Sequence, residues 1–101
     1  MSDTTAVTDN PAESRFQAVV DGHLAVLDYV LDGSRLVLVH TGVPDELGGQ
    51  GLGGQLVRAA LHRAVAEGLT LVPECPFARG WLEKHPDEAA TASIDWPASA
   101  P

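Results

Sequence analysis

The chain opens with three runs of mostly apolar residues that are separated by short polar turns. Asp21-Gly22 and Asp32-Gly33 form the breaks, and Asp-Gly between β-rich runs is the strongest short-range signal for a hairpin. The runs themselves are Phe16–Val20, His23–Leu31 and Arg35–Thr41. We therefore predict an antiparallel meander of three strands.

The second half of the chain predicts a strand, a helix, a strand and a final helix. Arg35–Thr41 is nearly all apolar between polar ends, which predicts a central strand covered on both faces. A helical apolar spacing follows from about Gly51 to Glu67. Leu69–Pro73 then reads as a fourth strand, and Pro76–His85 as a second helix that ends before Pro86.

This order predicts a mixed α+β fold, in which a meander is followed by a βαβ unit and a last helix. A strand, helix, strand unit places its two strands parallel with a right-handed crossover. The carboxyl ends of both strands and the start of the crossover helix then share one edge of the sheet, where open α/β sheets bind ligands. His40, the glycines before the helix and Cys75 should all reach that edge.

The two ends of the chain read differently from its middle. Residues 1–14 are polar and broken by Pro11, without the apolar or Arg-rich pattern of a signal or transit peptide, so we expect a disordered tail. Residues 89–101 are rich in Ala, Ser and Pro and should be a frayed tail. The domain is expected at 15–88.

Composition narrows the class of partner. The formal net charge is −8 in 101 residues, and no basic stripe is present, so a nucleic-acid partner is not expected and a cationic or amine substrate fits better. No apolar run approaches the length that spans a bilayer. Cys75 is the single cysteine, which favours a reducing compartment, by default the cytoplasm. We expect a monomer or weak dimer.

The densest glycine stretch runs from Leu47 to Val57. Five of the seven residues from Gly48 to Gly54 are glycine, which can take positive φ and let a ligand approach the backbone. Free N–H groups there add to the partial positive charge at the start of the next helix. The stretch predicts a phosphate or pyrophosphate site; a flexible loop that only caps the helix is the plainer alternative.

Two side chains at the same edge are candidates for chemistry. Cys75 precedes Pro76, so it falls near the N-cap of the second helix, where the helix dipole lowers a thiol pKa; the alternative is a buried cysteine that fills space. His40 ends the central strand and could act as a general base or pair with the thiol. Alternatively, the His40 imidazole only forms hydrogen bonds with the backbone and has no chemical role. No Cys/His cluster has zinc spacing, and we predict no metal.

Two phosphate-loop motifs can be weighed against this context. Residues 49–54 formally satisfy G-x-G-x-x-G, but a dinucleotide fingerprint follows its strand directly, whereas about seven loop residues intervene here. A Walker A loop is excluded because no Gly-Lys-Ser/Thr follows.

The order of elements resembles the GNAT N-acetyltransferase superfamily, and the chain looks most like its small, single-domain acetyltransferase-like members. The resemblance covers about Arg15 to Glu88. The motifs that carry it are Val39-His40-Thr41, Val43-Pro44-Asp45-Glu46-Leu47, Gly49-Gln50-Gly51-Leu52-Gly53, Val72-Pro73-Glu74-Cys75-Pro76-Phe77 and Lys84-His85-Pro86.

The resemblance implies binding of acetyl-coenzyme A. The pyrophosphate would lie on the glycine-loop amides and the pantetheine along the central strand. The implied cofactor-binding residues are Leu38, Val39, His40, Gly48, Gly49, Gln50, Gly51, Leu52, Gly53 and Gly54. Two positions depart from the superfamily pattern: Gly48 replaces an Arg or Gln, and Trp81 stands where many members have a general-acid tyrosine. The small subfamily carries a cysteine that matches Cys75.

Three hypotheses follow. The first is an acetyl-coenzyme A-dependent N-acetyltransferase for an unidentified amine, with His40 or a water as base, or with an acetyl relay through Cys75. The second is a non-catalytic module that binds acetyl-coenzyme A or coenzyme A. The third is a nucleotide-binding fold of another type.

Overall fold

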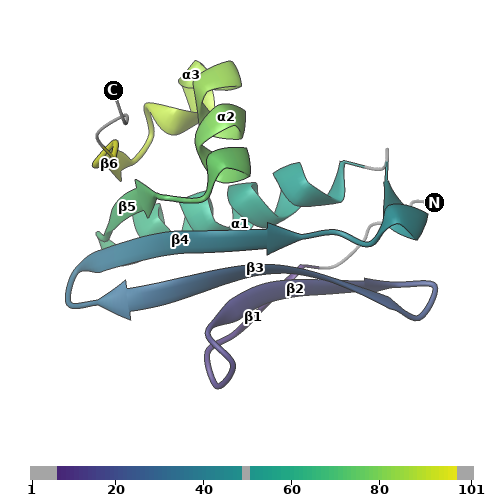
Figure 1. The fold of residues 1–101 in the computed structure, drawn as a ribbon. Coiled ribbons are helices and arrows are strands. Elements are labelled where there is room, and N and C mark those ends of the chain that lie inside the picture. Colours follow the sequence, from purple (N-terminus) through teal and green to yellow (C-terminus); the bar gives the residue numbers. More distant parts are fainter. Residues whose placement is uncertain (1–6, 49–50, 98–101) are drawn as a thin grey trace.

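The computed structural model describes residues 7–48 and 51–97, and its sheet has the six strands in chain order, β1 to β6. The strands are β1 (Thr8–Asn10), β2 (Arg15–Val20), β3 (His23–Asp32), β4 (Arg35–Gly42), β5 (Thr70–Pro73) and β6 (Ser93–Ile94). β1 to β4 are antiparallel, whereas β4, β5 and β6 run parallel. The predicted meander and βαβ unit are therefore both present (Figure 1).

The helices follow the expected order. A short 3-10 turn, η1 (Asp45–Leu47), leads to α1 (Leu52–Glu67), and β5 leads to α2 (Pro76–Lys84) and α3 (Pro86–Ala89). α1 begins after Gly51 and ends at Gly68, and both glycines have positive φ, 72° and 68°. Glycine tolerates this conformation without a Cβ clash, which sets both ends of the helix.

The helices cover one face of the sheet, so the prediction that the central strand is covered on both faces is wrong. Leu36 and Leu38 of β4 are fully buried against the helices, while Val39 is 45% exposed. Val19, Leu24 and Val30 are likewise exposed on β2 and β3. We call the uncovered side the open face. An apolar run cannot distinguish a strand buried on both faces from a half-open one, because valine is common on both.

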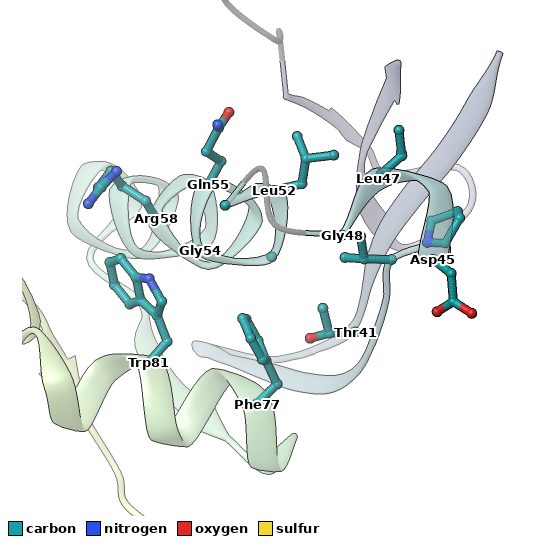
Figure 2. A pocket seen from close by; sticks show the side chains of 14 residues that line it. Thr41, Asp45, Leu47, Gly48, Leu52, Gly54, Gln55, Arg58, Phe77 and Trp81 are labelled. Carbon is teal, nitrogen blue, oxygen red and sulfur yellow. The ribbon is translucent and has the colours of Figure 1, made fainter. Parts of the chain in front are cut away.

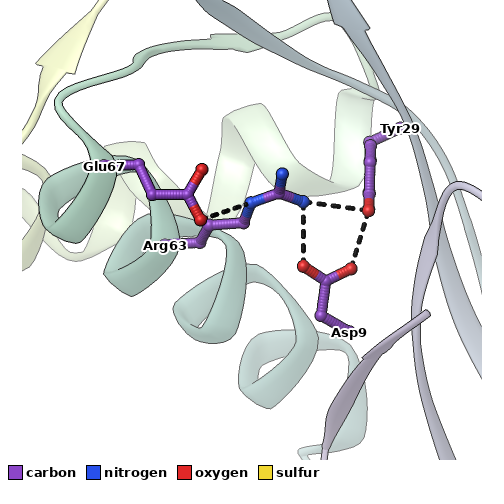
Figure 3. Close-up of polar contacts among 4 residues, drawn as sticks. All are labelled: Asp9, Tyr29, Arg63 and Glu67. Atoms are coloured by element: carbon purple, nitrogen blue, oxygen red, sulfur yellow. Dashed lines mark hydrogen bonds and ion pairs between the residues drawn. The ribbon is translucent and has the colours of Figure 1, made fainter. Parts of the chain in front are cut away.

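The segment predicted as a disordered N-terminal tail contains β1, so the prediction is wrong for residues 8–14. Thr8–Asn10 pair with Arg15–Gln17. The side chain of Asp9 attaches this strand to the rest of the fold. Its carboxylate accepts a hydrogen bond from Tyr29 Oη (2.7 Å) and forms an ion pair with Arg63 (2.8 Å). Figure 3 shows these side chains meeting from β1, β3 and α1.

Part of the C-terminal segment also pairs with the sheet, so the expected frayed tail at 89–101 is wrong for residues 93–95. Ser93 and Ile94 lie parallel to Thr70 and Leu71 of β5, and the Asp95 N–H donates to the Leu71 carbonyl. Asp95 also forms a 2.8 Å ion pair with Arg35. Two residues of strand are too few for a sequence pattern to reveal.

Candidate functional site

A cleft of about 530 Å³ opens where the end of β4, the start of α1 and one side of α2 meet. Figure 2 shows Phe77 and Trp81 of α2 facing the first turns of α1 across it. Its lining is Thr41, Val43, Pro44, Asp45, Leu47, Gly48, Gly51, Leu52, Gly53, Gly54, Gln55, Arg58, Phe77 and Trp81. The predicted ligand edge of the βαβ unit is therefore hollowed.

The glycines at the start of α1 have different structural roles. Gly51 turns the chain into the helix, whereas Gly53 and Gly54 let α2 approach. A Cβ on Gly53 would come within 2.6 Å of Phe77 Cζ, and one on Gly54 would collide with the Trp81 indole nitrogen. Two of the glycines predicted for the anion cradle are thus also needed for helix packing.

The described backbone amides of the glycine stretch differ in whether they are already hydrogen-bonded. The Gly48 N–H donates to the Asp45 carbonyl at 3.0 Å, so it is already used. Leu52, Gly53 and Gly54 occupy the first turn of α1, where N–H groups have no partner within the helix. Among the described residues, no side-chain hydrogen bond caps this end. Gly49 and Gln50 lie outside the described residues.

Trp81 is fixed from several sides. Its ring stacks on His85 with centroids 3.9 Å apart, and the Arg58 guanidinium lies 5.2 Å from its centroid. The His85 Nδ1 is in addition 2.7 Å from the Trp81 carbonyl. The indole is therefore a rigid wall of the cleft. Indole is a donor only, so it cannot take the acid role of a tyrosine by titration.

Arg58 reaches the cleft from α1 and is paired with α3. Its Nε and Nη2 donate to the two carboxylate oxygens of Glu88 at 2.6 and 2.9 Å. This bond raises the pKa of Arg58 and lowers the pKa of Glu88, so both groups stay charged. Gln55 lines the cleft beside Arg58.

The backbone of β4 separates from β5 beside the cleft. Their pairing ends at Leu38 with Pro73, after which the Cys75 N–H donates to the Leu38 carbonyl at 2.9 Å. On the other side, Leu38 pairs with Tyr29 and His40 with Asp28, so Val39 is an extra, bulged residue. β-Bulges re-aim the chain and are frequent next to active sites.

Cys75 and His40 are on opposite faces of the sheet, and the Cys/His pair allowed by the sequence is not formed. Cys75 is buried, and its Sγ lies 3.1 Å from Thr41 Oγ1 on the helix-covered side. His40 is exposed on the open face, because its Nε2 and Val26 Cγ2 would each lie 3.5 Å from a Cβ on Gly42. Thr41 lies between the thiol and the cleft.

Two general features of the described residues complete the picture. They contain no group of three or more His, Cys, Asp or Glu side chains arranged to hold a metal ion. None of their helices has the length and apolar character needed to traverse a bilayer.

Comparison with known proteins places the chain in a family. The family model for GCN5-related N-acetyl-transferases matches residues 15–91, so the chain belongs to that family. The fold is also similar to the solution structure of a GCN5-like protein from Staphylococcus aureus, with 29% identity, 95% of this chain and 91% of that chain covered, and a TM-score of 0.69. No curated protein matches.

The aromatic wall is the part of the site that sequence reasoning missed. Neither Phe77 nor Trp81 was among the predicted binding residues, yet Phe77 is 48% exposed and both line the cleft. One signal for them exists in the sequence. Two aromatics four residues apart on one helix match two adjacent glycines, Gly53 and Gly54, in the first turn of another.

Proposed function

We propose that the protein transfers the acetyl group of acetyl-coenzyme A to an amine. The observation that carries the proposal is the cleft at the start of α1, in a chain of the GCN5-related family. It combines uncapped amides at Leu52–Gly54 for a diphosphate with apolar and aromatic walls for a pantetheine arm. The bulged backbone near Val39, where β4 leaves β5, would lie beside the thioester.

In the transfer, the amine nitrogen attacks the thioester carbonyl carbon, the carbon–sulfur bond breaks, and coenzyme A leaves as the thiolate. The amine proton passes to a base, and the leaving thiolate takes up a proton. His40 is the proposed base, either directly or through a water, because it is exposed where the open face meets the bulge. An amine acceptor would then approach from the open face while the donor occupies the cleft.

A relay through Cys75 is a variant of this route. The thiolate would attack the acetyl carbon and displace coenzyme A, and the amine would then attack the acetyl-cysteine and release the thiolate. The contact with Thr41, which lines the cleft, supports a path to Sγ. The burial of Cys75 counts against ready access.

A second function, a non-catalytic acetyl-coenzyme A or coenzyme A binding module, is favoured by one observation. Tyr29 is the only tyrosine, and it is bound to Asp9 and Arg63, outside the cleft lining. With Trp81 at the cleft wall, the residues described there include no tyrosine to protonate a leaving thiolate.

Two measurements separate these functions. Calorimetric titration with acetyl-coenzyme A, coenzyme A and NAD tests the donor: heat with NAD alone would overturn both. Release of free thiol during a screen of amines, polyamines and lysine peptides tests transfer. If acetyl-coenzyme A binds but no amine causes release of free thiol, the protein is the binding module and not the enzyme.

A further inference from the structure

Arg58 is the one cation among the described residues that line the cleft. Its neighbours there are apolar, aromatic, glycine or uncharged polar side chains, with Asp45 as the other charge. The chain as a whole carries −8, so a cation retained in this cleft needs an explanation. The rest of the chain's cations are Arg15, Arg35, Arg63, Arg79 and Lys84.

Two contacts fix the orientation of the Arg58 guanidinium. Glu88 occupies its Nε and Nη2 edge, and the Trp81 ring centroid lies 5.2 Å from its Cζ. Within the described residues, Nη1 has no hydrogen-bond partner, and the side chain is 42% exposed. The guanidinium is thus held at the cleft wall, and its Nη1 N–H donors are left for a ligand.

A fixed guanidinium with spare donors fits a phosphate group. Guanidinium groups bind phosphate through paired N–H donors, and the Nη1 side of Arg58 is the part that Glu88 leaves open. Arg58 lies six residues along α1 from Leu52, about 9 Å at 1.5 Å per residue. Coenzyme A carries its diphosphate and a 3′-phosphate on one ribose, so the two phosphates are separated by only a few bonds.

We propose that Arg58, positioned by Glu88 and Trp81, binds the ribose 3′-phosphate of the donor and makes the cleft select coenzyme A thioesters over carriers without that phosphate. This inference rests on the proposed function and specifies which donors it accepts.

The test compares coenzyme A with 3′-dephospho-coenzyme A by calorimetry on the whole protein. Wild type should bind coenzyme A about tenfold or more tightly, the value of a hydrogen bond between charged groups. Arg58→Gln should bring the ratio of the two affinities near one, because the variant binds coenzyme A no better than the dephospho form. Arg79→Gln, on α2 and outside the cleft lining, is the matched control and should keep the wild-type ratio.

Equal affinities in wild type, or a preference that survives in folded Arg58→Gln, would overturn the inference while the proposed function stands. Binding of neither ligand would overturn both. Glu88→Ala tests the positioning role, since it frees the guanidinium without removing it. The preference should fall towards one; a preference that rises would show that Glu88 competes with the phosphate, and an equal loss for both ligands would show a purely structural role.

Discussion

Phe77 lies directly on the backbone of Gly53, and a Cβ at Gly53 would come within 2.6 Å of its ring. Trp81 makes the same kind of contact with Gly54, the next residue of α1. The two aromatic side chains differ in how freely they can move. Phe77 is 48% exposed and can turn away. Trp81 is held by His85 and Arg58 and cannot.

Alanine at these two glycines should therefore have unequal effects. Either change brings a helix-propensity gain of up to about 1 kcal/mol. Gly53→Ala should stay within about 1 kcal/mol of the wild-type free energy of unfolding, because Phe77 moves. Gly54→Ala should lose about 1–3 kcal/mol through overpacking. Urea unfolding measures both, with Gly54→Ala in a Trp81→Leu background as the control that should recover the loss. Equal effects at both positions would contradict this account.

Gly51 allows a matched test of the anion site. Gly51 and Gly33 both have positive φ, 72° and 58°, and a Cβ at either position would have no other atom within 4 Å beyond its chain neighbours. Glutamate at either position adds the same strain and the same charge, but only Gly51 lines the cleft. Gly51→Glu should abolish coenzyme A binding by calorimetry, and Gly33→Glu should bind like wild type. Undiminished affinity in folded Gly51→Glu would refute the placement of the phosphates.

The meander was predictable because its signals are local. Asp-Gly suits turns that need left-handed residues, and Asp21, Gly22 and Gly33 do have positive φ, 52°, 78° and 58°. β1 was not predictable, because a three-residue polar strand is stabilised by Asp9 reaching Tyr29 and Arg63, which lie 20 and 54 residues away in the chain. Such contacts leave no periodic pattern.

The candidate site likewise has a part that the sequence predicts and a part that it does not. The topology alone brought the start of α1, the end of β4 and Cys75 to one edge, because parallel strands joined by a helix have their carboxyl ends at the same edge. Which face each side chain takes depends on the bulge at Val39. That extra residue places Thr41 next to Cys75 and leaves His40 on the open face. The roles of Cys75 and His40 remain predictions.

An acetyl relay predicts a covalent adduct on Cys75. Intact-mass analysis after exposure to acetyl-coenzyme A should show one added acetyl group in wild type and none in Cys75→Ala. Thr41→Val removes the hydroxyl beside Sγ at nearly constant shape, and it should slow adduct formation if the hydroxyl assists the thiol. Absence of any adduct between mildly acidic and alkaline pH would leave direct attack by the amine as the route, and then Cys75→Ala should retain acceptor-dependent thiol release.

The cluster of Tyr29, Asp9 and Arg63 predicts a loss of stability at alkaline pH. Burial, followed by the hydrogen bond to Asp9, raises the pKa of Tyr29 above its ordinary value near 10.0, against the opposing effect of Arg63. The folded state therefore keeps the phenol protonated where the unfolded chain has begun to ionise. The contribution of Tyr29 to stability is complete below the unfolded pKa and is lost as pH rises through the folded pKa.

Tyr29→Phe isolates this contribution. Near neutral pH the variant should unfold more easily by about 1.5–3 kcal/mol, because the hydrogen bond to the Asp9 carboxylate is gone. Between about pH 9 and pH 11 its stability should fall less than that of wild type, since no buried phenol remains to ionise. Urea unfolding across this range gives the two slopes, and tyrosinate absorbance reports Tyr29 alone because it is the only tyrosine. All other side chains are common to both proteins, so parallel slopes would mean that Tyr29 ionises as easily in the folded as in the unfolded state.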